Sequence, residues 1–260
     1  VAPAGRSWVV DDWPRLQTFT PDGQPQTQLV PQTTMPFAPV DVAEAPDGDL
    51  IVGEARRLLR MSTAGAISQA LGLADASGSP WLTALAWRSD GLRRVTVLDS
   101  GLVHARDYGL TRTLRAIGAW PLAPPEGWSL YWDLAGPEPH PRERVYAADR
   151  GGRRVVVFES GRRVAAWTIE GVPTRIAVDA AGSIYVLAAD GLLHKLTSGG
   201  DLVALWDVGA FSAGASEVVD VAVDAGGRVY TVDRSANAVH VWARDPETTP
   251  EAPASRGSAC

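Results

Sequence analysis

Residues 175–186 read Arg175-Ile176-Ala177-Val178-Asp179-Ala180-Ala181-Gly182-Ser183-Ile184-Tyr185-Val186. The same order returns as Asp220-Val221-Ala222-Val223-Asp224-Ala225-Gly226-Gly227-Arg228-Val229-Tyr230. Each copy has an alternating apolar run, a Gly turn and a second apolar run, a pattern that predicts two antiparallel strands. Related copies recur about every 44 residues, and a repeat of this length with several strands per unit is typical of a β-propeller.

The repeat predicts an all-β fold, a six-bladed β-propeller of four-stranded antiparallel blades. Five copies of the innermost strand are expected at Val40 to Ala43, Leu82 to Trp87, Leu130 to Leu134, Ile176 to Asp179 and Val219 to Asp224. The first 35 residues add a partial blade at the seam, where the two ends of the chain meet. We therefore expect one propeller domain over 1–245, with the partial seam blade at 1–35, five blades at 36–245 and a Pro-rich tail at 246–260.

Several phrases in the chain resemble NHL repeats. They include Trp8-Val9-Val10-Asp11 with Arg15-Leu16-Gln17-Thr18-Phe19-Thr20-Pro21-Asp22-Gly23, and Arg175 to Asp179 with Gly182 to Val186. The resemblance implies a six-bladed propeller that serves mostly as a binding platform. Propellers host unrelated functions, so the motif predicts fold rather than activity.

Composition excludes several classes of partner. The formal net charge of −6 provides no basic surface for nucleic acid. No apolar run approaches the ~18 residues that would span a membrane. Cys260 is the only cysteine, so no internal disulfide is expected. Nucleophile-elbow, phosphate-loop and dinucleotide motifs are absent from the sequence, and no pattern assigns a compartment.

Histidines and acidic residues are the candidates for a metal site, and we expect no metal and no cofactor. Three histidines fall in the third strand of their blades at nearly the same repeat position, which places them on a ring too wide to share one ion. They are His104, His194 and His240, and His140 lies in a Pro-rich loop. A lyase of this fold would need histidines that converge.

Acids recur at two positions of the repeat. The acids that end the second strand are expected to accept hydrogen bonds from the loop that follows, with a polar binding rim as the alternative. They are Asp11, Glu54, Asp99, Asp149, Asp190 and Asp233. The acids that end the innermost strand are expected to be turn residues rather than the channel metal ligands of a propeller lactonase. They are Glu44, Asp133, Asp179 and Asp224.

One mouth of the propeller is the expected binding surface. Aromatic side chains of the connections between blades either wedge between the sheets or form an exposed patch, and arginines occupy the neighbouring loops. The candidate binding residues are Phe37, Trp81, Trp128, Phe211, Arg56, Arg150 and Arg234. We expect a protein scaffold without enzymatic activity that binds a protein partner or a larger assembly, such as a bacterial surface or phage-tail-like particle. The alternative is a hydrolase or lyase of the propeller lactonase type that acts on a small molecule in the channel.

The seam is expected to be incomplete. The fifth copy has no obvious outermost strand after Trp242, and the amino-terminal copy has no innermost strand. Only 243–260 remain, and this stretch contains Pro246, Pro250 and Pro253, which cannot donate to a strand ladder. We therefore expect the missing strand to come from further chain or from a partner that adds to the edge.

Overall fold

The computed structural model describes residues 7–10, 14–20, 24–31, 36–45, 47–73, 82–88, 94–99, 104–110, 114–121, 131–135, 144–160, 162–210, 217–224 and 227–242. From 82 to 135 it describes the backbone alone. These residues form 22 strands and no helix. None of the described segments is a helix that could span a membrane.

The strands form antiparallel sheets of four or three strands in chain order. The four-stranded sheets are β4 (Pro39–Glu44), β5 (Leu50–Glu54), β6 (Arg57–Met61) and β7 (Ile67–Gly72); β8 (Leu82–Arg88), β9 (Arg94–Asp99), β10 (His104–Leu110) and β11 (Leu114–Pro121); β12 (Tyr131–Ala135), β13 (Arg144–Asp149), β14 (Arg154–Glu159) and β15 (Arg162–Thr168); and β16 (Pro173–Val178), β17 (Ile184–Ala188), β18 (Leu192–Leu196) and β19 (Leu202–Asp207). The three-stranded sheets are β1 (Ser7–Val10), β2 (Leu16–Phe19) and β3 (Pro25–Leu29); and β20 (Val218–Val223), β21 (Val229–Asp233) and β22 (Ala238–Trp242).

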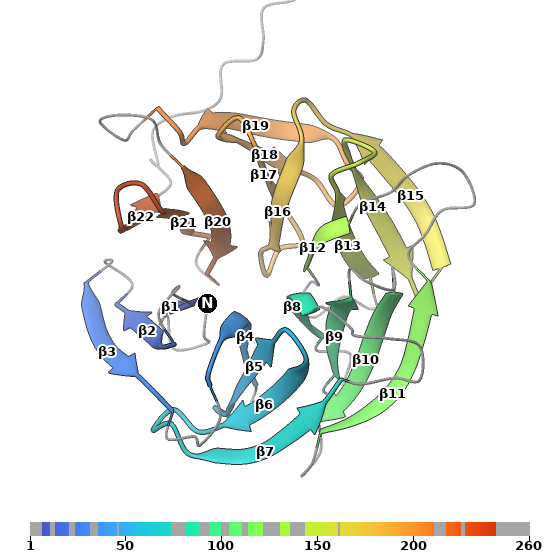
Figure 1. The fold of residues 1–260 in the computed structure, drawn as a ribbon. Coiled ribbons are helices and arrows are strands. Elements are labelled where there is room, and N and C mark those ends of the chain that lie inside the picture. The colour runs from blue at the N-terminus through green and yellow to red at the C-terminus, as the bar shows by residue number, and fades with distance from the viewer. Residues whose placement is uncertain are drawn as a thin grey trace, which may run out of the picture.

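The sheets radiate from a common centre, as expected for a propeller (Figure 1). The first strand of each sheet from β4 onward lies nearest the centre, and the fourth lies on the circumference. Successive inner strands are in contact from β4 through β8, β12 and β16 to β20. This arrangement fits the all-β, propeller-like prediction, and the observed inner strands overlap the five predicted ones.

The hydrophobic core lies between adjacent sheets. One cluster joins Tyr146 and Val155 of the β12–β15 sheet to Ile176 and Val186 of the next sheet. A second joins the β16–β19 sheet to the β20–β22 sheet, and a third joins the amino-terminal sheet to β4–β7. Because each sheet buries both faces only against its neighbours, no single sheet of this kind is stable alone.

The two three-stranded sheets lie at the seam, where the sequence predicts missing strands. β1 contacts β4 as β13 contacts β16, which makes β1 the second strand of its sheet rather than the innermost one. The sheet that ends in β22 lacks a fourth strand within the described part of the chain. The source of the missing strands stays a prediction.

Candidate functional site

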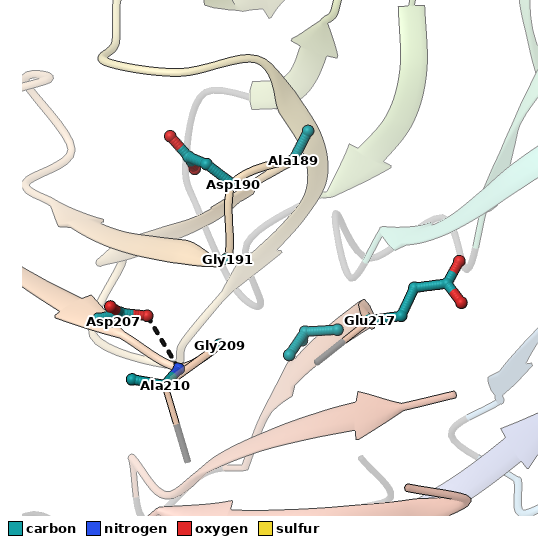
Figure 2. A pocket seen from close by; sticks show the side chains of 8 residues that line it. Ala189, Asp190, Gly191, Asp207, Gly209, Ala210 and Glu217 are labelled. Carbon is teal, nitrogen blue, oxygen red and sulfur yellow. Dashed lines mark hydrogen bonds between the residues drawn. The ribbon is translucent and has the colours of Figure 1, made fainter. Parts of the chain in front are cut away.

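A pocket of about 390 Å³ lies between the β16–β19 and β20–β22 sheets (Figure 2). It is lined by the turn at 189–191, by residues 207–210 after β19, and by 217–218 at the start of β20. These are a loop between second and third strands and a connection between sheets. The pocket therefore lies at the mouth that the sequence proposes as the binding surface.

Closely packed backbone forms one wall of this pocket. A Cβ on Gly191, whose φ is 84°, would lie 3.1 Å from the Cα of Gly209, so position 191 needs glycine for this approach. The N–H groups of Val208 and Gly209 both donate to the Gly191 carbonyl, at 3.0 and 3.3 Å. Since backbone hydrogen bonds hold it, this wall is formed before any ligand binds.

Three carboxylates surround the pocket, and no basic side chain lines it. Asp207 Oδ1 accepts from the Ala210 N–H at 3.0 Å, and Asp190 Oδ1 accepts from the Leu192 N–H at 3.3 Å. Glu217 Oε1 accepts from Arg234 at 3.2 Å in an exposed ion pair, which contributes little to stability. The side chains point in different directions around the pocket (Figure 2), so they form an acidic rim rather than one ligand cage.

Histidines do not converge in the structure. His194 and His240 occupy the same register position, opposite Val186 and Thr231, whereas His104 lies opposite Asp99, two positions earlier in its strand. In the described part of the chain, no three His, Cys, Asp or Glu side chains are close enough to hold a metal ion. His140 lies outside the described residues.

His194 is a buried polar group between the β12–β15 and β16–β19 sheets. Its side chain is 2 % exposed, and its Nε2 has no hydrogen-bond partner within the described residues. Burial lowers the pKa of His194, while Asp190 and Glu170 act in the opposite direction. The ring is therefore neutral at physiological pH and acts as part of the core.

Some of the acids at the ends of the second strands accept hydrogen bonds from the loop that follows, as the sequence predicts. Asp149 accepts from the Gly152 N–H and Asp233 from the Ala236 N–H, both at 3.0 Å. Glu54 instead accepts from the Ala38 N–H, which ties the strand to the connection before β4. Asp190 lies in the turn two residues beyond the end of β17. Asp11 and the side chain of Asp99 are outside the described residues.

Of the four acids expected to be turn residues, Asp179 and Asp224 lie in the turns after their inner strands, as predicted, and each also accepts from a tyrosine. Asp133 lies within β12 instead, so the turn prediction is wrong for it. Asp179 accepts from the Ser183 N–H at 2.8 Å and from the Tyr185 hydroxyl at 3.2 Å. Asp224 accepts from the Arg228 N–H at 2.9 Å and from the Tyr230 hydroxyl at 3.1 Å. Burial alone would raise the pKa of Asp224, but these donors and the Arg228 guanidinium together lower it. Glu44, the last residue of β4, differs, since it accepts from Trp8 Nε1 of the amino-terminal sheet.

Inner strands β16 and β20 bring Arg175 and Asp220 together near the centre of the ring. Arg175 Nε lies 3.6 Å from Asp220 Oδ1. Each residue follows a register shift in its strand, as does Asp41 in β4. The Asp220 side chain is 56 % exposed, yet the inner strands surround it. This crowding raises the pKa of Asp220, and Arg175 opposes the effect.

The predicted binding residues divide into three groups. Phe37 is 6 % exposed and packs in the core between the amino-terminal sheet and β4–β7, so the wedge alternative holds for it and the surface role is wrong. Arg56, Arg150 and Arg234 are exposed, and their role in binding stays a prediction. Trp81, Trp128 and Phe211 lie outside the described residues.

Sequence reasoning missed the residues that the structure places closest to a site. Asp207 and Asp220 do not end an inner or second strand, so the repeat gave no reason to choose them. The signal for Asp220 is its register match with Asp41 and Arg175, which depends on an irregularity in strand pairing. The outer strands also carry a repeated signal, an aromatic residue at Trp120, Trp167 and Trp206.

Comparison with known proteins supports the fold. Neither a protein-family model nor a curated protein sequence matches the chain. Virginiamycin B lyase from Staphylococcus aureus superimposes with a TM-score of 0.61 at 13 % identity, covering 93 % of this chain and 82 % of the lyase. A catalytically inactive variant of that lyase with quinupristin gives 0.62 at 11 % identity, covering 93 % and 86 %. A protein of unknown function from Bacteroides caccae gives 0.66 at 11 % identity, covering 91 % and 89 %. At these identities the likeness shows an all-β, propeller-like fold and nothing more specific.

Proposed function

We propose that the chain is a six-bladed propeller of the NHL-repeat type, with a propeller domain over 1–245 and a tail over 246–260, that binds a partner protein through its mouth. The observation that carries this proposal is the pocket at the mouth with its rim of three dispersed carboxylates. Carboxylates that point in different directions suit several basic side chains of a protein surface better than one small cation. Such a rim steers and orients a partner of opposite charge.

The partner is therefore a protein segment rich in Lys or Arg that crosses the rim. Arg234, which forms an ion pair with Glu217, lies on one side of this surface. Asp190 and Asp207 lie on the other side. Rim pairs exposed to solvent are worth about 0.2–1 kcal/mol each, so affinity comes from several pairs together. Salt should weaken the interaction because it screens such pairs.

A basic peptide tests the proposal. The probe is a decapeptide of alternating Lys and Gly, titrated at low salt by calorimetry, with a Glu-Gly peptide for comparison. Glu217→Gln and Asp190→Asn should each weaken binding about two- to five-fold. The matched control is Asp201→Asn, in a turn at the other end of the same sheet, which should leave affinity unchanged. Equal losses for all three variants, or no preference for the basic peptide, would contradict the proposal.

A second candidate, a lyase or hydrolase acting at the centre of the ring, is favoured by one observation. Asp220 has a raised pKa beside Arg175, and perturbed carboxyl groups are enriched at catalytic sites. The structural neighbours also include a lyase. Incubation with quinupristin followed by mass spectrometry separates the two functions. Cleavage that is lost in Asp220→Asn would favour the enzyme, and an intact substrate is expected if the chain is a binding module.

A further inference from the structure

The outer edge of β22 differs from the equivalent edges in the rest of the molecule. β22 is the third strand of its sheet, and in the described residues it pairs with β21 alone. All five of its residues are half-buried, whereas the third strands β6, β14 and β18, which have a fourth strand beside them, are mostly buried. Among the described strands, none lies beside β22 on this side.

An exposed tryptophan on the outer strand β19 lies next to this edge. Trp206 is 43 % exposed and pairs with Leu193, which belongs to the cluster between this sheet and β20–β22. Trp206 stacks on Tyr185, with ring centroids 6.5 Å apart. Tyr185 in turn packs in the same cluster as Trp242 at the end of β22. Trp206 and the edge of β22 are therefore parts of one surface, which we call the β19/β22 surface.

The neighbouring junction shows what covers such a surface when the sheet is complete. Trp167 occupies in β15 the position that Trp206 occupies in β19, since each pairs with the equivalent residue of the third strand, Val155 or Leu193. Gly200, in the turn before the outer strand of the next sheet, lies directly against the Trp167 ring, because a Cβ there would be 2.5 Å from the indole. At this junction the tryptophan is thus covered by a glycine, Gly200, which is followed by an extended strand, β19.

The sequence after β22 does not carry the signals that form this cover. In the turns after β6 and β18, the hydroxyls of Ser62 and Thr197 accept a backbone N–H four residues ahead, and Gly65 and Gly200 have φ of 87° and 95°. The matching positions after β22 are Ala243 and Pro246. Alanine has no hydroxyl, and proline has no N–H and a fixed negative φ. The sequence after β22 thus lacks both signals of this turn.

We propose that the β19/β22 surface binds an extended segment of a partner protein, which adds as a strand antiparallel to β22. Strand addition supplies main-chain hydrogen bonds, and pockets for alternate side chains supply specificity. The segment should carry apolar residues at alternate positions and a glycine or alanine against Trp206, as Gly200 lies against Trp167. This proposal does not depend on the acidic rim or on the function proposed for the mouth.

The test uses the neighbouring hairpin as a probe. A synthetic peptide with the sequence of residues 198–207, Ser-Gly-Gly-Asp-Leu-Val-Ala-Leu-Trp-Asp, is titrated into the full chain, and hydrogen exchange at the β22 amides is followed by NMR. We expect saturable binding with micromolar affinity and at least ten-fold slower exchange in β22. Trp206→Ala should weaken binding about ten-fold while the folded spectrum is kept. Val164→Ala, on the exposed part of β15, is the matched control and should bind as the native chain does.

Three outcomes would overturn the proposal. The first is no binding of the peptide, or binding that leaves exchange in β22 unchanged. The second is protection of β22 in the free chain that is lost when residues 243–260 are replaced by a Gly-Ser stretch of equal length, which would make the tail the occupant. The third is protection that rises with protein concentration together with dimer formation, which would make a second copy the occupant.

Discussion

Two neighbouring junctions between sheets each have a tryptophan at the same position of the outer strand, Trp167 in β15 and Trp206 in β19. The two junctions differ in what covers this tryptophan. Between the β12–β15 and β16–β19 sheets, the core extends from inner strand β16 to Trp167 on outer strand β15. Between the β16–β19 and β20–β22 sheets, no described residue of outer strand β19 joins the core, and Trp206 is 43 % exposed. Whether the tryptophan is buried therefore depends on the junction, because the residues that cover it must come from the next sheet.

The largest expected effect is at Gly200, in the junction between the β12–β15 and β16–β19 sheets, which we call the closed junction. Gly200→Ala adds a Cβ to a residue with φ of 95° and places it against the Trp167 ring, so the free energy of unfolding should fall by about 3 kcal/mol. Gly182→Ala is the matched control, with φ of 82° and no atom within 4 Å, and should cost about 1 kcal/mol. Urea unfolding measures both. Equal losses would mean that the contact with Trp167 contributes nothing.

The two tryptophans give the next largest contrast. Trp167→Ala should lower the free energy of unfolding by about 2 kcal/mol, because the half-buried indole fills the closed junction. Trp206→Ala should lower it by about 0.5 kcal/mol, because much of its ring already faces water. Chemical denaturation of the two variants under the same conditions checks this difference. A similar loss in both would show that the second junction is covered in solution.

Tyrosine hydroxyls supply a smaller contrast between copies of the repeat. Tyr230→Phe should cost about 1 kcal/mol, because it removes the hydrogen bond to buried Asp224. Tyr146 is the matched control, since its buried hydroxyl has no partner of good geometry among the described residues, although Arg144 acts on it electrostatically. Tyr146→Phe should therefore be neutral or slightly stabilising. Thermal unfolding that shows a clear loss for Tyr146→Phe would mean that Arg144 donates a hydrogen bond to the hydroxyl.

The smallest expected effect is on pH dependence in the closed junction. An unfolded histidine takes up a proton near pH 6.5, and burial lowers the pKa of His194 in the folded state. Between these values the unfolded state binds more protons, so stability falls as the pH falls below 6.5. His194→Leu should flatten this part of the profile. An unchanged profile in His194→Leu would contradict this expectation.

The candidate site could be predicted from the sequence mainly in its location. The mouth was identified from loops between repeated strands, and the pocket lies there. Of its acids, Asp190 was among the candidates for a polar binding rim, whereas Asp207 was not chosen, because its approach to Asp190 and Glu217 depends on the angle between two sheets. Phe37 was misplaced for the same reason, since an aromatic residue in a connection can face water or the adjacent sheet.

The sequence by itself determined the order of the inner strands and the turn acids Asp179 and Asp224. These features depend on contacts within one repeat, where alternation of apolar residues and short-range hydrogen bonds act over a few residues. Only the tertiary structure decided which of two equivalent tryptophans is covered, which acids surround the pocket, and that Arg175 meets Asp220. The physical reason is that each of these depends on neighbouring sheets, and the local pattern of a repeat does not encode the position of its neighbour.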